Sequence, residues 1–237
     1  MTEHQVIGNA VLYCCDARDI TDLLKGYVDA VVTDPPYGID YRIGDSGHGH
    51  SLRLKKPIYG DAEPFDPAWI LDFVYRSGMD IPLLLWGADC YKERLPQGGT
   101  MLCWDKSCGQ GAANSFIDAE FAWMNRRNAR CIYRLFWKGA TRSGEGKAER
   151  KFHPSQKPVE LMRWCLETAR IGIGKAVLDP YMGSGTTGLA CVTTGRKFIG
   201  VEIDREYFDI ACRRIEQAQQ QATLFDEWEL ENDSLAA

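Results

Sequence analysis

The sequence predicts an α/β fold, a doubly wound and mostly parallel sheet with helices on both faces. Short apolar runs of strand length alternate with stretches of helical periodicity along most of the chain. A buried strand in the second half also runs directly into a glycine-rich turn and a helix, the order found in βαβ units. At 237 residues, 45% of them apolar, the chain can bury one sizeable core, so we expect a single domain.

The first half of the chain is predicted to contain five strands and one helix. The first two strands are apolar runs that each end at an aspartate, Asp16 and Asp34. The expected strands are 10–15, 28–33, 81–86, 99–104 and 132–137. The expected helix, 67–77, has apolar residues at helical spacing, namely Trp69, Ile70, Phe73 and Val74.

The second half is predicted to alternate three helices with two strands. A proline opens the first helix, where its missing N–H costs nothing, and Gly195 stops the second helix. The expected helices are 158–169, 187–194 and 207 to about 220, and the expected strands are 176–178 and 197–203. Five acids and no base follow from residue 226, so we expect 222–237 to form an acidic, flexible tail.

Composition argues against several classes of protein. The sequence has no run of about 18 apolar residues and no basic amino terminus followed by an apolar stretch. We therefore expect neither a membrane span nor a signal peptide, and a cytoplasmic location. Nine cysteines without C-x-x-C spacing are expected to be reduced core thiols, and no metal site is predicted.

Charge is distributed unevenly along the chain. The net charge is −5, and the tail alone accounts for it, so the rest of the chain is neutral. Between residues 126 and 151 nine bases stand against two acids, and a second basic stretch runs from 42 to 56. Glycines in the first of these stretches indicate a basic loop suited to phosphates, and a solvated charged face is the alternative.

The motif VVTDPPYG, residues 31–38, is the most informative part of the sequence. It describes a buried strand that stops at two prolines and presents Asp34 at its carboxyl end, the edge where open α/β sheets bind ligands. Asp34 offers a carboxylate acceptor, Pro35 a free carbonyl and Tyr37 an aromatic face. Two acceptors and a flat ring suit a planar amino group, such as the exocyclic amine of a nucleobase.

The motif VLDPYMGSGTTGLA, residues 177–190, predicts a second binding element. Gly183 and Gly185 are expected to let the backbone approach a ligand, while amides of the following helix point at an anionic group such as a carboxylate. About twenty residues further on, a strand ends at Glu202, where an acid can accept both hydroxyls of a ribose. This acid favours an adenosine cofactor, and the P-loop pattern G-x-x-x-x-G-K-[ST] is absent from the sequence.

The segments DPPYG, HPSQKPVELM and DPYMGSGTTGLAC, in this order, resemble the amino-group DNA methyltransferases that use S-adenosylmethionine, in their permuted (beta) class. The resemblance covers nearly the whole chain, because LYCCDARD, LLWGAD, GGTMLCWDK and YRLFWKG are similar to other core segments of the family. It implies a Rossmann-like, seven-stranded methyltransferase sheet with an antiparallel edge hairpin. It divides a domain of residues 1–221 into a catalytic half (about 1–137), a basic loop (138–152) and a cofactor-binding half (153–221). One departure is Tyr181, where the family commonly has phenylalanine.

The resemblance implies roles for the matching residues. Asp34 and the Pro35 carbonyl would accept the hydrogens of the target amine, Pro36 would stiffen the loop, and Tyr37 would stack on a base that has left the duplex. Lys157 is the best candidate for the methionine carboxylate, Glu202 for the ribose and Asp16 for the adenine of the cofactor. The expected cofactor contacts are Asp16, Asp34, His153, Ser155, Lys157, Pro158, Asp179, Pro180, Tyr181, Gly183, Gly185, Thr186, Thr187, Glu202 and Ile203. A turn or cap role is the alternative for Asp16, and a structural histidine for His153.

Basic residues around the site are expected to bind DNA. Only about fifteen residues separate the last strand of the first half from HPSQKP, where relatives often insert a recognition domain, so we expect a short or relaxed recognition site. The expected contacts are Arg42, Arg53, Lys55, Lys56, Lys106, Arg142, Lys147, Arg150 and Lys151. An aspartate before the prolines is more usual for adenine-N6 targets. The alternatives are cytosine-N4, an amine of RNA or a protein amide, and a cofactor-responsive nucleic-acid-binding protein without chemistry.

The tail carries one further motif, Q-x-x-L-F, formed by Gln221, Leu224 and Phe225. It resembles the peptide that bacterial replication proteins insert into the sliding clamp. A hydrophobic staple that folds back on the final helix is the alternative. The expected partners are therefore DNA and, through this motif, a clamp, with no membrane and with the chain as a monomer or homodimer.

Overall fold

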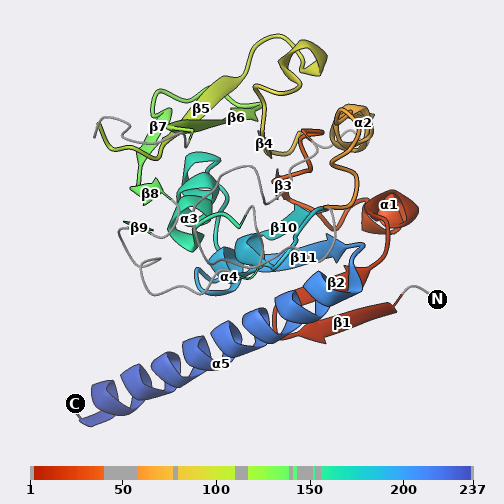
Figure 1. Ribbon diagram of the computed structural model, residues 1–237. Helices are drawn as coiled ribbons and strands as arrows, with labels where there is room; N and C mark the ends of the chain where they lie inside the picture. The colour runs from red at the N-terminus through yellow and green to blue at the C-terminus, as the bar shows by residue number, and fades with distance from the viewer. Residues whose placement is uncertain are drawn as a thin grey trace.

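The computed structural model describes residues 3–39, 58–76, 80–109, 117–138, 141–142, 152 and 156–235 (Figure 1). The side chains of residues 76, 138, 141, 142 and 222–235 lie outside this description. Of the helices described, none combines the length and the apolar character needed to cross a bilayer.

A nine-stranded sheet forms the centre of the described structure, in the order β1-β2-β11-β10-β3-β4-β6-β5-β7. Its five central strands, from β2 to β4, are parallel to one another. β1 is antiparallel to β2 at one edge, and β6 is antiparallel to both β4 and β5 near the other. The strands are β1 (Glu3–Ile7), β2 (Ala10–Cys14), β3 (Ala30–Thr33), β4 (Leu83–Trp86), β5 (Thr100–Asp105), β6 (Ala119–Met124), β7 (Ile132–Arg134), β10 (Ala176–Asp179) and β11 (Lys197–Glu202). A separate hairpin joins β8 (Trp137–Lys138) to β9 (Thr141–Arg142).

Helices cover both faces of the sheet, as the alternating pattern predicts (Figure 1). One face packs on α3 (Val159–Thr168), α4 (Thr186–Val192) and α5 (Arg205–Leu235), whose apolar side chains join strand residues such as Leu84 and Phe198 in one core cluster. The other face packs on the short helices η1 (Ala17–Ile20) and α1 (Thr21–Leu24) and on α2 (Ala68–Arg76), around Val31 and Leu85. A further short helix, η2 (Lys92–Arg94), follows β4. The predicted fold class, a doubly wound and mostly parallel sheet, is confirmed.

The structure differs from the sequence prediction in three places. The described sheet has nine strands rather than seven, because β1 adds an edge strand and β6 lies between β4 and β5. The first four residues of β1 are exposed, so this edge strand leaves no apolar signal in the sequence. The predicted strand 132–137 is divided between β7 and β8. The final helix continues to Leu235 instead of ending near residue 220, since no glycine or proline interrupts it.

The centre of the sheet places the two sequence motifs side by side. β3, which precedes DPPYG, pairs in parallel with β10, which leads into the glycine-rich turn. From β3 the chain crosses through α2 to β4, and from β10 it crosses through α4 to β11, on the opposite face. Neighbouring strands whose connections leave in opposite directions open a crevice at their carboxyl ends. Asp34 and Asp179 both lie at that crevice.

Candidate active site

One cavity in the crevice is lined by both motifs. Asp34 contributes from the DPPYG loop, Lys157 from the segment before α3, and the glycine-rich turn closes the remaining side. The lining residues are Asp34, Gln156, Lys157, Met162, Asp179, Tyr181, Met182, Gly183, Ser184, Thr186 and Thr187. Acidic and basic groups therefore share one small space with two methionines and an aromatic ring.

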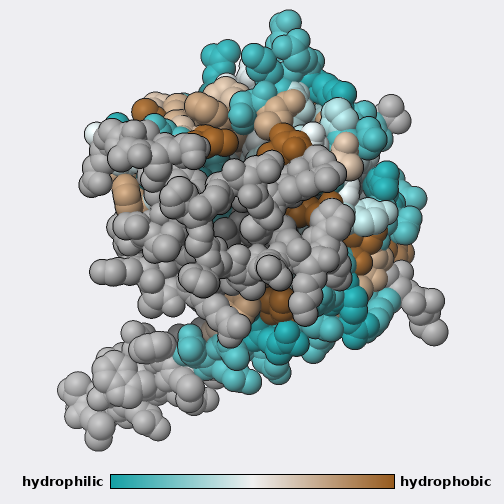
Figure 2. All heavy atoms as spheres, in the orientation of Figure 1, coloured by the Kyte–Doolittle hydropathy of each residue, from teal (hydrophilic) through white to brown (hydrophobic). Residues whose placement is uncertain are grey.

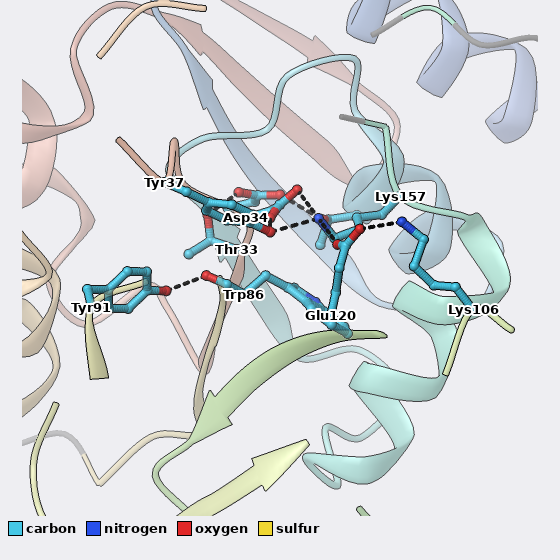
Figure 3. A network of polar contacts seen from close by, with 10 residues as sticks. Thr33, Asp34, Tyr37, Trp86, Tyr91, Lys106, Glu120 and Lys157 are labelled. Atoms are coloured by element: carbon cyan, nitrogen blue, oxygen red, sulfur yellow. Dashed lines mark hydrogen bonds and ion pairs between the residues drawn. The ribbon is translucent and has the colours of Figure 1, made fainter. Parts of the chain in front are cut away.

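Asp34 is held by two hydrogen-bond donors from different directions (Figure 3). The Tyr37 hydroxyl donates to Oδ1 at 2.5 Å, and the Lys157 ammonium donates to Oδ2 at 2.7 Å. Lys157 also donates to the Tyr37 hydroxyl at 2.9 Å, so the three side chains form a closed triangle. Burial raises the pKa of Asp34, and the nearby Lys157 charge opposes that rise. The acid is therefore close to a cation and sheltered from water.

A second acid, the partly buried Glu120, lies beside Lys157, and the sequence analysis missed it. Glu120 lies on β6, with Oε2 3.1 Å from Lys157 Nζ and Oε1 2.6 Å from Lys106 Nζ (Figure 3). Burial on its own would raise the pKa of Glu120, but the ammonium groups of Lys157 and Lys106 outweigh it and hold the pKa at about 2. The carboxylates of Asp34 and Glu120 outweigh the effect of burial on Lys157 and raise the pKa of its ammonium group. Two acids and two bases thus alternate along one row.

Lys106, one of the predicted DNA contacts, is paired within the protein. Its side chain is only 17% exposed, and its ammonium points inward to Glu120 rather than out to solvent. Lys106 directly follows β5, and the β5–β6 register places Trp104 opposite Glu120, so a lysine at this position reaches the buried acid. The ammonium of Lys106 is therefore engaged by a carboxylate of the protein, which a sequence pattern of basic loop residues does not reveal.

Asp179 lies at the end of β10 and accepts three hydrogen bonds from neutral donors. Thr33 Oγ1 donates to Oδ1 at 2.6 Å, Thr187 Oγ1 donates to Oδ2 at 2.6 Å, and the Tyr181 amide donates to Oδ1 at 3.1 Å. Burial raises the pKa of Asp179 to about 6, although the hydrogen bonds from Thr187 and Thr33 act against this rise. Asp179 therefore ties β3 to α4 and fixes the start of the glycine-rich turn.

Glu202 holds the other side of the same turn. Its Oε2 accepts from the Gly183 amide at 3.0 Å and its Oε1 accepts from the Asp204 amide at 2.7 Å. Burial raises the pKa of Glu202 to about 7, against the effect of those two amides. Each carboxylate oxygen keeps a further lone pair, so Glu202 can still accept hydrogen bonds from a ligand. The Gly183 amide, in contrast, is engaged within the protein.

Gly185 has a different reason for being glycine than the predicted close approach to a ligand. Its backbone has φ +83°, and a Cβ added there would lie 3.0 Å from the Ala211 Cβ of α5. Gly185 does not line the cavity, whereas Gly183, with φ +51°, does. Gly185 is therefore required for the turn and for packing of α4 against α5.

Tyr181, where the family commonly has phenylalanine, uses its hydroxyl. The Trp69 indole donates to the Tyr181 Oη at 3.1 Å, and the two rings meet edge to face with centroids 6.1 Å apart. Phe65 packs on the Tyr181 ring from another direction at 5.8 Å. The hydroxyl thus links the wall of the cavity to α2 on the other face of the sheet.

A buried aspartate fixes the loop that carries Asp34. Asp61 is 4% exposed, and its Oδ1 accepts from the Gly38 amide at 2.9 Å. Gly38 has φ +75°, and a Cβ there would lie 2.4 Å from the Glu63 carbonyl oxygen. The Tyr37 ring likewise requires Gly87, where a Cβ would lie 2.2 Å from Tyr37 Cε1. The loop after β3 is therefore held by contacts that require glycine at Gly38, within the loop, and at the distant Gly87.

The structure brings many of the predicted site residues to one place. Those lining the cavity are Asp34, Lys157, Asp179, Tyr181, Gly183, Thr186 and Thr187, and the sequence analysis missed Gln156, Met162, Met182 and Ser184 beside them. Asp16 accepts from the Arg18 amide at 2.9 Å and caps η1, which is the alternative weighed for it. Pro35 is buried, Pro36 and Tyr37 are half-buried beside Asp34, and Pro158 precedes α3. Pro180 and Ile203 follow β10 and β11.

Several predictions fall outside the described residues. These are His153 and Ser155 among the expected cofactor contacts, and Arg42, Arg53, Lys55, Lys56, Lys147, Arg150 and Lys151 among the expected DNA contacts. The side chain of Arg142 is outside the description as well. The same holds for Leu224 and Phe225, so clamp binding stays a prediction. In the described part of α5 the outer face is hydrophilic down to an exposed Gln221 (Figure 2).

Comparison with known proteins identifies the family of this chain. A family model for DNA methylases of the N6/N4 type matches residues 86–213, more than half of the chain. The chain belongs to the N6/N4 DNA methylase family. The family resemblance inferred from DPPYG, HPSQKPVELM and DPYMGSGTTGLAC is confirmed.

Curated relatives match over a short stretch. The DNA adenine methyltransferase YhdJ of Escherichia coli (strain K12) is 46% identical over 66 residues, and the type II methyltransferase M2.DpnII of Streptococcus pneumoniae is 44% identical over 64 residues. These matches cover 28% and 27% of this chain. They span only 22% and 24% of the length of those relatives.

Solved structures match over most of the chain. The complex of M1.HpyAVI with SAM is 25% identical with a TM-score of 0.53, over 86% of this chain and 98% of that one. Two others share the fold at lower identity. TTHA0409, a putative DNA modification methylase from Thermus thermophilus in complex with S-adenosyl-L-methionine, is 21% identical with a TM-score of 0.51, over 88% and 95% of the two chains. The cytosine-N4-specific PvuII DNA methyltransferase is 13% identical with a TM-score of 0.56, over 92% and 93%.

Proposed function

We propose that this protein transfers a methyl group from S-adenosylmethionine to the exocyclic amine of a DNA base, with adenine-N6 as the favoured target. The observation that carries the proposal is the shared cavity, because Asp34 and the glycine-rich turn line the same space. An acceptor for an amine and a turn suited to a nucleoside cofactor are thus within reach of one another. Family membership and the M1.HpyAVI–SAM neighbour support the same activity.

The residues present fit S-adenosylmethionine. Glu202 fixes the turn through Gly183 and keeps lone pairs for ribose hydroxyls. Met162, Met182 and the Tyr181 ring provide an apolar wall in the same cavity. When bound, S-adenosylmethionine supplies a methyl group that the adjacent sulfonium charge activates. Lys157, which the resemblance suggests for the cofactor carboxylate, already contacts Asp34, Tyr37 and Glu120, so we do not propose that role for it.

Asp34 acts on the amine by accepting a hydrogen bond from one of its N–H groups, and it is the proposed acceptor of the proton that the nitrogen loses once it carries the methyl group. An aromatic amine donates its lone pair into the ring, and acceptors on its hydrogens favour the geometry in which the lone pair is free. The Pro35 carbonyl is the proposed second acceptor, and Tyr37 the proposed stacking partner of the flipped base. Asp34 does not need to be a strong base, because positioning and charge stabilisation supply most of the rate enhancement in this scheme.

The favoured target rests on the acid itself. An aspartate before the prolines is the form more usual for adenine, and the E. coli relative is named a DNA adenine methyltransferase. Cytosine-N4 is the second candidate, because the PvuII enzyme with the same fold is cytosine-N4-specific. We propose a short or relaxed recognition site, read by the basic segments 42–56 and 139–151.

The test is a methylation assay with identification of the product. Unmethylated genomic DNA is incubated with methyl-labelled cofactor, digested to nucleosides and separated. We expect labelled N6-methyladenine from the wild type and none from Asp34→Ala. Labelled N4-methylcytosine would replace the favoured target with the second candidate. No labelled nucleoside, or equal yields from wild type and variant, would refute the proposal.

A further inference from the structure

The Lys157 ammonium lies between two carboxylates that come from distant parts of the chain. Its Nζ is 2.7 Å from Asp34 Oδ2 and 3.1 Å from Glu120 Oε2, and the lysine side chain is 6% exposed. Figure 3 shows the ammonium in the middle of this row, with Lys106 beyond Glu120. Lys157 therefore contacts both carboxylates at once, and small rotations of its side chain can strengthen its contact with either one.

The position of Lys157 at Asp34 is the one that a substrate amine needs. An ammonium and an aromatic amine both present N–H donors of similar size to a carboxylate. In the present structure Asp34 Oδ1 accepts from Tyr37 and Oδ2 accepts from Lys157. An amine that donates to Asp34 competes with the Lys157 ammonium for that oxygen.

Glu120 is prepared to receive the displaced ammonium. Its Oε1 accepts a hydrogen bond from Lys106 at 2.6 Å. Its Oε2 is buried, and within the described part of the chain no donor makes a hydrogen bond of good geometry to it, although Lys157 Nζ is only 3.1 Å away. A buried carboxylate oxygen without a hydrogen bond costs free energy. A small shift of Lys157 toward Glu120 is therefore favourable, because it would turn the 3.1 Å ion pair into a hydrogen bond.

We propose that Lys157 holds the place of the target amine at Asp34 and withdraws to Glu120 when the amine arrives, which makes Glu120 a positioning residue. The inference rests on the proposed function and adds a residue that acts on substrate entry. The charge of the row is unchanged by the movement, since two carboxylates and two ammonium groups remain together. Without a substrate, the ion pair keeps Asp34 in contact with a donor instead of leaving it unpaired.

The test is a double-mutant cycle between Glu120 and Lys157. Glu120→Gln removes the charge that receives the ammonium, so kcat/KM for DNA at saturating S-adenosylmethionine should fall about 10- to 100-fold, the usual range for one hydrogen bond to a charged group. In a Lys157→Met background no ammonium has to move. Glu120→Gln should then cost less than about twofold, because coupled residues are not additive. Glu120→Asp should restore part of the lost rate.

Controls separate this role from a structural one. Glu216→Gln changes an exposed glutamate on α5 and should leave kcat/KM unchanged. The Kd of S-adenosylmethionine, measured by calorimetry, should be the same for wild type and Glu120→Gln. Equal losses in both backgrounds, or a weaker cofactor Kd with unchanged kcat/KM for DNA, would overturn the proposal. A wild type that methylates no DNA would refute the proposed function itself. An active wild type with an equally active Glu120→Gln variant would refute only the proposed movement of Lys157 from Asp34 to Glu120.

Discussion

Two Asp-Pro sequences lie at the ends of neighbouring strands, yet their aspartates have different partners. Asp179 accepts from two threonine hydroxyls and one amide, short neutral donors whose positions are fixed by β3 and by the glycine-rich turn. Asp34 accepts from a tyrosine hydroxyl and from the long side chain of Lys157. Short donors on rigid elements hold a structure, whereas a lysine can exchange partners. The difference indicates that Asp179 has a structural role beside the site and that Asp34 takes part in the proposed reaction.

Replacing the working acid gives the largest expected effect. Asp34→Asn keeps the size of the side chain but removes the charge, so methylation of DNA should fall by two to three orders of magnitude, the usual cost of losing one group that stabilises the transition state. The thermal midpoint should change little, and the cofactor Kd should stay within a few-fold of wild type. Methylation by Asp34→Asn within tenfold of wild type would contradict the inference that Asp34, unlike Asp179, takes part in the reaction.

Replacing the supporting acid should affect stability first. Asp179→Ala leaves the hydroxyls of Thr33 and Thr187 and the amide of Tyr181 without their acceptor, so the free energy of unfolding should fall by about 2–4 kcal/mol. Urea unfolding followed by circular dichroism measures this change. A stability equal to that of the wild type would show that Asp179 does not have the structural role inferred from its three donors.

The pH dependence of stability sharpens the role of Asp179. Burial raises its folded-state pKa to about 6 from an unfolded value of 3.8, so the folded protein holds its proton over a range where the unfolded chain has lost it. This contribution to stability is full below about pH 4 and is lost as the pH rises to about 6. Asp179→Asn should flatten that part of the profile, and the fall due to Glu202, up to about pH 7, should remain. An unchanged profile would contradict the raised pKa.

A change on the cofactor side should weaken binding without removing activity. Glu202→Gln keeps an acceptor for one amide but loses the charge, so the Kd for S-adenosylmethionine should rise about 10- to 100-fold. Methylation should recover at high cofactor concentration, because Asp34 is unaffected. Calorimetry and a cofactor titration of the rate give the two values. A loss of rate that saturating cofactor does not restore would place Glu202 with Asp34 in the chemistry rather than in binding.

The smallest expected effect is at the aromatic wall. Trp69→Phe removes the indole donor to Tyr181, and the free energy of unfolding should fall by about 1 kcal/mol, with a cofactor Kd within a few-fold of wild type. Tyr181→Phe is the matched variant, since it removes the other half of the same bond. Losses in the two variants that add fully in the double variant would show that the hydrogen bond is not shared between them.

Much of the fold could be predicted because its signals are local. Apolar runs in the central strands and the proline before α3 are properties of adjacent residues, and they gave elements within a few residues of those observed. The exposed edge strand β1 and the strand β6 were missed, because the first shows polar residues to solvent and the second does not alternate. The length of α5 was underestimated, since charge indicated a flexible tail where helix-forming residues continue.

The sequence by itself determined the chemistry of the site: an acid, prolines and an aromatic ring after one strand, and a glycine turn and an acid around another. Only the tertiary structure decided which charges meet. Lys157 is 123 residues from Asp34 in the chain, and Glu120 and Lys106 arrive from the β5–β6 pair. Spacing in a sequence carries no information about partners joined by sheet order. The two partly buried acids that share one lysine, Asp34 and Glu120, are therefore a property of the fold and not of any motif.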